Sequence, residues 1–470
     1  MSKKLSKSPP PIVFILLAAL GIFGRSKFQS LSPQDANPVT EIASKLPFVS
    51  RSESSLLKRF SWGEKILISA NATTAKRSGI NDYRQQKYAK AADYFQQSLA
   101  EYPDDPETSI YLHNALVAGQ QPVKMAVVVP IGSNLDVAQE MLRGVAQAQA
   151  EYNQQNGKLQ IQIVNDENDT NLARQVAQIL VKDDSVLAVV GSNASNASLA
   201  GAKVYQKAGM VMITPTSTSD KLSNFGDYIY RAAPTNQVMA DTLAEYVVNT
   251  AKRKNVAICA DSQAPDNFTF KAAFIPALLA KGGNYVDAQC DFAAPDFNAE
   301  NSVTNLISSG AEAVLLAPHI DKLNRPIELA KANQWKMMLF GSFSLNTTKI
   351  TKTGQGDLNG VVLPVPFHQQ QDTASDFTAK AKQLWNEDIV LTWRTATSYD
   401  AVKAIATTLA TSSTRQEIQR QLKQDTFAIS GANGTVKFLS SGDRSLEPAL
   451  VNVKANPERG YYFELIKQQR

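Results

Sequence analysis

The sequence contains very few of the residues on which metal and redox chemistry depend. It has two cysteines, Cys259 and Cys290, and three histidines among 470 residues. Two cysteines cannot build a disulfide framework or a four-ligand zinc site. Each cysteine lies in a strand-like run of one predicted βαβ unit, so a single bridge and two buried free thiols both remain open. We therefore expect no metal ion and no cofactor.

Charge patterns and catalytic motifs are also sparse. The formal net charge is only +5, and no basic stripe interleaved with aromatic residues occurs in the body of the chain, so nucleic-acid binding is not expected. The sequence has no glycine-rich phosphate loop, no His-Glu-x-x-His and no Gly-x-Ser-x-Gly. With so few histidines, these absences argue against an enzyme, and we expect no catalytic residues.

The first residues are typical of an export signal. Lys3, Lys4 and Lys7 precede the apolar run Ile12–Gly24, which has signal-peptide length and falls short of the roughly 20 residues of a comfortable membrane span. No cysteine follows for lipid attachment, and no convincing cleavage site is present. We expect residues 1–27 to be kept as an anchor rather than removed. The lysines predict that the rest of the chain lies on the periplasmic side of the cytoplasmic membrane.

A linker over residues 28–75 is expected next, because no periodicity is sustained there. Residues 76–120 then have the spacing of a tetratricopeptide repeat, carried by Gly79, Tyr88, Ala91, Phe95, Ser98 and Pro103. A second helix is predicted from Glu107 to about Ala118. So short a repeat cannot bury its own apolar face, so it should dock on the large domain or on a partner. An αα-hairpin that only spaces the domain from the membrane is the alternative.

From Val123 onward, strands and helices alternate. Continuous apolar runs separated by amphipathic segments predict parallel sheets covered by helices on both faces. The fold class is therefore α/β, with two doubly wound, Rossmann-like lobes over residues 123–470. We place lobe 1 at about 123–235 and 367–440, and lobe 2 at about 236–366 and 441–470. The predicted strands are 124–130, 159–165, 186–191 and 210–214 in lobe 1, and 256–261, 285–292, 313–317 and 337–340 in lobe 2.

Two loops at the carboxyl ends of predicted strands are rich in short polar side chains. They are Ser192-Asn-Ala-Ser195-Asn-Ala-Ser198 and Pro215-Thr216-Ser217-Thr218-Ser219. Both are expected to open helices, where free N–H groups and hydroxyls make a cradle for an anion such as a carboxylate. The alternative is ordinary N-capping, for which Ser, Thr and Asn are the preferred residues.

Several other polar or aromatic residues are expected to have structural roles. The acidic loop 166–169 is expected to be a solvated turn rather than a calcium loop. His319 is expected on a loop at the surface, with a place in the lining of the cleft as the alternative, and Trp393 and Tyr399 are expected in the core, on a late helix.

The run from Met125 to the end resembles the type I periplasmic solute-binding proteins of the branched-chain amino-acid (leucine/isoleucine/valine-binding) family. The resemblance covers about three quarters of the chain in the right order. The matching stretches include Leu142-Arg143-Gly144, Val189-Val-Gly191-Ser-Asn-Ala-Ser195, Met212-Ile-Thr214-Pro-Thr-Ser-Thr218, Tyr230-Arg231-Ala-Ala-Pro234, Ser398-Tyr399-Asp400 and Ser430-Gly431-Ala-Asn-Gly434. The anchor and the repeat-like helices ahead of it resemble a cyanobacterial subgroup.

The resemblance implies a ligand bound between two lobes that close about a hinge. Ser195, Thr216 and Thr218 match the positions that hold the ligand carboxylate, and Asn193 lies in the same loop. The acidic residue that pairs with a ligand ammonium is missing, because Phe343 stands there. Asp266 or Asp261 would then supply the charge, or the ligand is not an ordinary α-amino acid.

The function implied is the extracytoplasmic solute-binding component of an ABC importer. Its partners would be ABC permease subunits and a small amino acid-like ligand, either an amino acid or a related small carboxylate or amide. Two alternatives remain: a ligand-sensing receptor ectodomain with the same fold, and a degenerate paralogue that no longer binds amino acids.

Overall fold

The computed structural model describes residues 55–70, 72–458 and 460–467, with the side chains of 265–267 excluded. By its internal packing the chain divides into two units, residues 1–58 and 59–470, and the second unit is the subject below. The expected anchor, residues 1–27, lies outside the described residues. Within the described ranges, no helix has the length and apolar character that a membrane crossing requires.

The first sheet has six strands in the order β1-β3-β2-β4-β5-β6. All pairs are parallel except β1 with β3. The strands are β1 Phe60–Ser61, β2 Val123–Val129, β3 Leu159–Asn165, β4 Val186–Val190, β5 Val211–Thr214 and β6 Ile229–Arg231. The helices of this lobe are α7 Leu135–Gln154, α8 Thr170–Leu180, α9 Ser195–Ala208, α14 Ser375–Leu384, α15 Trp393–Leu409 and α16 Arg415–Leu422. We call this lobe 1.

Helices cover both faces of this sheet, and the alternation along β2 shows it. Met125, Val127 and Val129 belong to the core cluster that also contains residues of α7 and α15. Ala126 and Val128 belong to a second cluster, which contains residues of α8 and α9. Successive side chains of a strand point to opposite faces, so a strand buried on both faces reads as a continuous apolar run.

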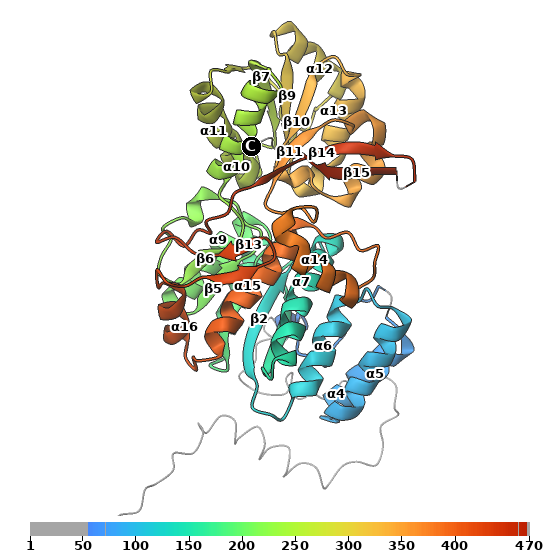
Figure 1. Cartoon of the computed structure of the whole chain (residues 1–470), viewed down its shortest axis with the longest axis vertical. Coiled ribbons are helices and arrows are strands. Elements are labelled where there is room, and N and C mark those ends of the chain that lie inside the picture. The colour runs from blue at the N-terminus through green and yellow to red at the C-terminus, as the bar shows by residue number, and fades with distance from the viewer. Residues whose placement is uncertain (1–54, 71, 459, 468–470) are drawn as a thin grey trace, which may run out of the picture. The chain divides into compact units, whose positions relative to one another are not determined.

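The second sheet has seven strands in the order β15-β14-β11-β10-β9-β7-β8. Five are parallel, and β14 and β15 add an antiparallel hairpin at one edge. The strands are β7 Asn255–Ala260, β8 Asn284–Val286, β9 Ala313–Ala317, β10 Met338–Gly341, β11 Val362–Val365, β14 Ala449–Asn456 and β15 Gly460–Leu465. The helices are α10 Asn236–Glu245, α11 Pro265–Ala280, α12 Ala299–Ser308 and α13 Asn324–Asn333. Figure 1 shows α10 and α11 on one side of this sheet and α12 and α13 on the other. We call this lobe 2.

The chain passes between the two sheets three times, after β6, after β11 and before β14. The last passage follows a small hairpin of β12 (Ile429–Gly431) and β13 (Gly434–Val436). Two buried ion pairs fasten this stretch to lobe 1: Arg231 Nε lies 2.5 Å from Asp443 Oδ1, and Arg444 Nη1 lies 2.5 Å from Asp400 Oδ2. These pairs explain why the late segment stays on the first sheet until residue 444.

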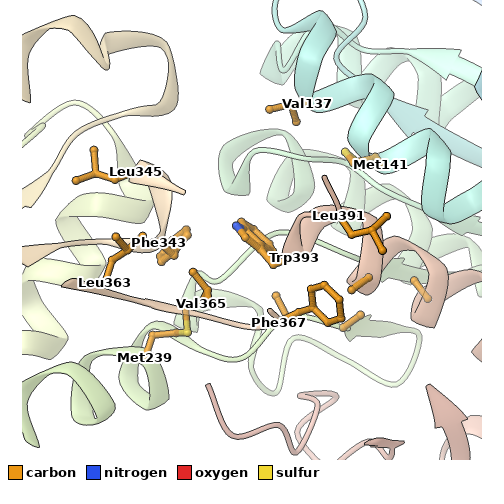
Figure 2. Close-up of a cluster of buried hydrophobic side chains, with 14 of the residues drawn as sticks. Val137, Met141, Met239, Phe343, Leu345, Leu363, Val365, Phe367, Leu391 and Trp393 are labelled. Carbon is orange, nitrogen blue, oxygen red and sulfur yellow. The ribbon is translucent and has the colours of Figure 1, made fainter. Parts of the chain in front are cut away.

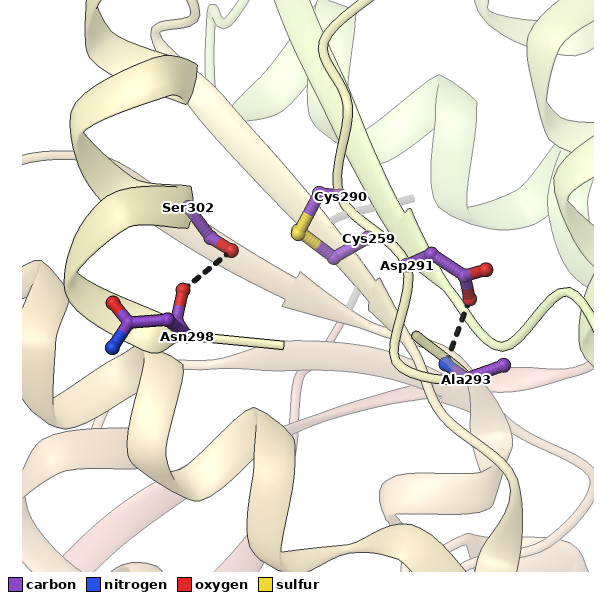
Figure 3. The surroundings of a disulfide bond; sticks show 6 residues. All are labelled: Cys259, Cys290, Asp291, Ala293, Asn298 and Ser302. Atoms are coloured by element: carbon purple, nitrogen blue, oxygen red, sulfur yellow. Dashed lines mark hydrogen bonds between the residues drawn. A yellow bond between two sulfur atoms is a disulfide. The ribbon is translucent and has the colours of Figure 1, made fainter. Parts of the chain in front are cut away.

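A disulfide bond joins Cys259 to Cys290, which settles the choice between a bridge and free thiols. The disulfide ties the end of β7 to the segment that follows β8. Strand β8 ends at Val286 and is therefore shorter than the expected strand 285–292. Beyond the bridge, Asp291 Oδ1 accepts a hydrogen bond of 2.7 Å from the Ala293 N–H (Figure 3). Pairing with β7 resumes next to the disulfide as one isolated bridge between Ala260 and Asp291.

Three helices lie between β1 and β2 in sequence: α4 Thr74–Arg84, α5 Tyr88–Glu101 and α6 Pro106–Val117 (Figure 1). They pack in series, α4 on α5 and α5 on α6, and α6 packs on α7 and β3 of lobe 1. Lys76 Nζ lies 2.7 Å from both Asp105 Oδ2 and Glu107 Oε2, and the three side chains are buried. Burial lowers the pKa of Lys76, but the Glu107 and Asp105 carboxylates outweigh burial, so the pKa is raised. The helices thus dock on the large domain, as one of the two expectations had it, through the contact of α6 with α7 and β3.

Candidate ligand-binding site

A small cavity of about 40 Å³ lies between the two lobes. It is formed where the carboxyl ends of parallel strands meet, which is the usual place for a ligand in open α/β sheets. The lobe 1 residues around it follow β4 and β5 or begin α15, and the lobe 2 residues follow β9 and β10. The lining consists of Asn193, Ala194, Thr216, Trp393 and Arg394 from lobe 1, and His319, Ile320, Phe343 and Ser344 from lobe 2.

Three of the six residues expected at the site lie in this lining: Asn193, Thr216 and Phe343. Ser195 and Thr218 do not line it, and both are buried. The Ser195 hydroxyl lies 2.5 Å from the Ser217 hydroxyl. Thr218 Oγ1 is buried, and among the described residues nothing hydrogen-bonds to it.

Asp266 belongs to the first turn of α11, and its side chain lies outside the described residues.

Hydrogen bonds join the loops that follow three strands of lobe 1, namely β3, β4 and β5. Thr216 Oγ1 donates to the Asn193 carbonyl oxygen at 2.9 Å. Asn193 Nδ2 and the Ala194 N–H both donate to Asn168 Oδ1, each at 3.2 Å. The Asn168 N–H in turn donates to Asp166 Oδ1 at 3.1 Å. The cavity edge in lobe 1 is therefore held in place by backbone and side-chain bonds from the loop 166–169.

This loop is not the solvated turn that we expected. Asp166 is fully buried, and burial raises its pKa to about 6. Asp169 caps α8, accepting the Leu172 N–H at 2.8 Å. A short run of acidic and amide residues suggests a solvent-exposed turn. Here the first carboxyl group, that of Asp166, is buried, and the last, that of Asp169, caps the next helix.

The two polar loops lead into different elements. The loop after β4 opens α9, which begins at Ser195 and has no side-chain cap at its N-cap residue Ala194. The positive end of a helix dipole therefore lies at the cavity, where Asn193 and Ala194 are in the lining. The loop after β5 opens only the 3₁₀ turn Asp220–Leu222 before strand β6, so the expectation of a second helix was wrong.

Phe343 occupies the position where the resemblance implies an acidic residue. Its ring meets Trp393 edge-on, with ring centroids 5.9 Å apart, and meets Phe270 in the same way at 5.9 Å. Figure 2 shows Phe343 and Trp393 side by side between apolar side chains of lobe 2, such as Leu363, and of lobe 1, such as Leu391. Trp393 is therefore a core residue, as expected, and also a wall of the cavity.

Arg394 is a cavity residue that sequence reasoning missed. Its Nη1 donates to Glu140 Oε2 at 3.2 Å and to the Asn346 carbonyl oxygen at 3.0 Å, so it joins lobe 1 to lobe 2. Its guanidinium lies over the Trp393 ring, 4.6 Å from the centroid. Burial lowers the pKa of Arg394, while the Glu140 charge acts in the opposite direction. The available signal was its place at the start of a helix beside a tryptophan.

Asp261, the second residue considered for the missing charge, is not in the lining. It is buried, and its Oδ2 lies 2.9 Å from Lys322 Nζ. Its other oxygen accepts the Gln263 N–H at 3.0 Å. Among the described side chains, no aspartate or glutamate lines the cavity. His319 lines the cavity, which was the alternative to a surface loop position.

Comparison with known proteins identifies the family. Residues 122–456 match the sequence profile of the family described as periplasmic binding protein. The leucine-specific-binding protein of Salmonella typhimurium is 23% identical over 281 residues, which cover 58% of this chain and 74% of that protein.

Solved structures share the fold. A Desulfitobacterium hafniense ABC transporter substrate-binding protein in complex with Leu has a TM-score of 0.64 and 22% identity, covering 73% of this chain and all (100%) of that one. A Rhodopseudomonas palustris solute-binding protein in complex with 4-hydroxybenzoate has a TM-score of 0.65 and 17% identity, covering 74% of this chain and 96% of that one. The chain has the type I periplasmic binding fold and belongs to the periplasmic binding protein family, whose members bind solutes and are not enzymes.

Proposed function

We propose that this chain is the extracytoplasmic solute-binding component of an ABC importer and that it binds an amino acid or a related small carboxylate between its lobes. One observation carries the proposal: a single cavity is built jointly by strand-end loops of both lobes. The relatives named for leucine binding and the substrate-binding neighbours support the same role. The permease subunits of such an importer are the protein partners, and no nucleic acid or cofactor is required.

Ligand binding would work through closure of the lobes. The α9 N-terminus and the Asn193 amide would present lobe 1 donors to a carboxylate, with the Thr216 hydroxyl holding Asn193 in place through its bond to the Asn193 carbonyl oxygen. Contacts that join the lobes, such as the Arg394 bond to the Asn346 carbonyl, would be lost when the lobes open. A ligand that touches both lobes therefore favours the closed form, which is how binding energy becomes a conformational signal to a permease.

Residues 1–27 would hold this domain at the periplasmic side of the cytoplasmic membrane. The support is the sequence pattern of early lysines before an apolar run. The proposal is tested by expressing the full chain and a version without residues 2–27 but with an unrelated cleavable export signal. We expect the first in the membrane fraction and the second in the periplasmic extract. Release of the full chain by osmotic shock would contradict the anchor.

A second candidate, a paralogue that no longer binds amino acids, is favoured by the size of the cavity. About 40 Å³ has room for on the order of three water molecules. The contact between Phe343 and Trp393 closes the space further. An importer component must therefore open its lobes to admit a solute, whereas a degenerate paralogue would stay closed.

A thermal-shift screen over amino acids, their amides and small carboxylic acids distinguishes the two. An importer component should show at least one compound that raises the melting temperature in proportion to the logarithm of its concentration. Asn193→Ala and Thr216→Ala should then weaken binding of that compound, while Thr304→Ala, on the exposed face of α12, should not. A flat screen would favour the degenerate paralogue.

A further inference from the structure

The geometry points to a narrower class of ligand. We propose that the cavity accepts small monocarboxylic acids that have an apolar, preferably aromatic, body and no ammonium group. This inference rests on the proposed function and specifies its substrate class. Three features of the cavity carry it: two sources of positive potential, carboxylates that are already engaged elsewhere, and aromatic walls.

The positive potential comes from α9 and from Arg394. The helix N-terminus at Ala194 has no side-chain cap, and the 14-residue helix behind it is long enough for a full dipole. Both hydrogen bonds that Arg394 makes to other described residues use Nη1. Its Nε and Nη2 therefore have no protein acceptor among the described residues, and the residue lines the cavity. A guanidinium edge of this kind matches the two oxygens of a carboxylate.

The carboxylates around the cavity are engaged with other groups. Glu140 accepts hydrogen bonds from Arg394 and from Thr392 Oγ1, the latter at 3.0 Å. Asp261 is paired with Lys322.

Two further acidic residues lie near the cavity but do not line it. Asp166 is buried behind the loop and accepts the Asn168 N–H. Asp321 lies beside His319, 3.3 Å from its Nδ1, with about half of its side chain exposed (48%). A ligand ammonium in the cavity would meet a helix N-terminus and a guanidinium with no described carboxylate to balance it, and burying an unbalanced charge is costly.

The aromatic walls do not replace the missing carboxylate. An ammonium can bind over a tryptophan face, but the guanidinium of Arg394 already lies over the Trp393 ring. Phe343 is packed edge-on between Trp393 and Phe270. Together with Ile320, the Phe343 and Trp393 rings offer an apolar surface to the part of a ligand that lies away from its carboxylate. Phe343 at this position thus replaces recognition of an ammonium by contact with a hydrocarbon body.

The test compares acids with the amino acids that differ from them only by the ammonium group. Titration calorimetry on the purified 59–470 unit and on the full chain would use 3-phenylpropanoate against L-phenylalanine, and 4-methylpentanoate against L-leucine. We expect each acid to bind at least tenfold more tightly than its amino acid. An amino acid that binds as tightly as its acid overturns this inference and leaves the proposed function standing. If no acid and no amino acid binds, the proposed function fails together with this inference.

Two variants separate recognition from structural damage. Arg394→Gln should lower the affinity for 3-phenylpropanoate at least tenfold and change the affinity for the neutral 3-phenylpropanamide by no more than about twofold. Arg174→Gln, on the exposed surface of α8, should change neither affinity. Equal weakening of acid and amide would show that Arg394 does not recognise the charge.

Asp266→Asn tests the one acidic side chain near this end of lobe 2 that the structure does not describe. We expect the preference for acids to be unchanged. If the substitution removes tight binding of an amino acid, Asp266 supplies the ammonium partner and the inference is wrong.

Discussion

Replacing Gly144 with alanine should separate the two helices that support the cavity in lobe 1. Gly144 lies in α7, and a Cβ atom at this position would stand 1.9 Å from the Thr395 carbonyl oxygen and 2.8 Å from the Tyr399 backbone nitrogen, both in α15. Ordinary contact begins near 3.4 Å, so the helices must move apart by 3.4 − 1.9 = 1.5 Å. Neither obstacle is a side chain that could rotate away.

The expected loss of stability follows from two opposing effects. Overpacking a core costs about 1–3 kcal/mol, and a clash with backbone belongs at the upper end. In a helix interior, alanine is intrinsically more favourable than glycine by about 1 kcal/mol, which offsets part of this cost. We therefore expect Gly144→Ala to lower the free energy of unfolding by about 2 kcal/mol, measured by urea denaturation followed by circular dichroism.

The same substitution should also weaken ligand binding, because the separated helices carry the Glu140–Arg394 pair. Gly201→Ala is the matched control: it lies inside α9, and its Cβ would meet only the Tyr205 side chain, at 3.1 Å. The control should leave the urea midpoint unchanged or raise it. If Gly144→Ala is as stable as the wild type and binds ligand equally well, the packing argument is refuted.

Three further outcomes can be measured on the same protein. Burial raises the pKa of Asp166 to about 6 from 3.8, so the folded state holds this proton more tightly than the unfolded state does. The free energy of unfolding should therefore fall by about 3 kcal/mol as the pH rises from about 4 to 6. Asp166→Asn should flatten this decline in the urea midpoint, and an unchanged pH profile would contradict the reasoning. The Cys259–Cys290 bridge spans 31 residues, so Cys259→Ser with Cys290→Ser should cost about 3–4 kcal/mol; a melting temperature equal to the wild type's would argue against it. Lys76→Met leaves the buried Glu107 carboxylate without its cation and should cost about 3–5 kcal/mol, whereas Lys90→Met at an exposed position of α5 should be neutral.

The repeating pattern of the sequence predicted most of the parallel strands of both sheets, but it did not predict β6, β11 or the antiparallel pair β14 and β15. Strand β3 was expected at 159–165 and β9 at 313–317, and the structure has both at those bounds. Strands buried on both faces are unbroken apolar runs, and this signal is local in sequence. β1 is different: its two residues, Phe60 and Ser61, lie in the segment expected to be a linker. Two residues are too few to show a periodic pattern, and they form a strand because they pair with β3.

The cavity was less predictable because its residues come from distant parts of the chain. Asn193 and Thr216 could be proposed because both follow predicted strands, and the carboxyl ends of parallel strands meet at one edge. Trp393 and Arg394 lie about 180–200 residues later, at the start of a helix, and no local pattern separates a core aromatic from a cavity wall. The resemblance drew attention to Phe343 only as a departure. Its role became visible when its ring was found against Trp393.

The three helices α4 to α6 are better understood as a cover for the edge of the first sheet than as a separate module. β3 is an edge strand apart from its short pairing with β1, and an open edge invites pairing with another chain. The Asn114 side chain of α6 closes it: Nδ2 donates to the Ile161 carbonyl oxygen at 2.8 Å, and Oδ1 accepts the Ile161 N–H at 2.8 Å. A single amide side chain thus makes both bonds that a neighbouring strand residue would make.

The same Asn114 Nδ2 also donates a hydrogen bond to the Trp62 carbonyl oxygen at 2.8 Å. The helices, the segment after β1 and lobe 1 therefore share one hydrogen-bond network. Because α6 is engaged in this way, its inner face is committed to the lobe.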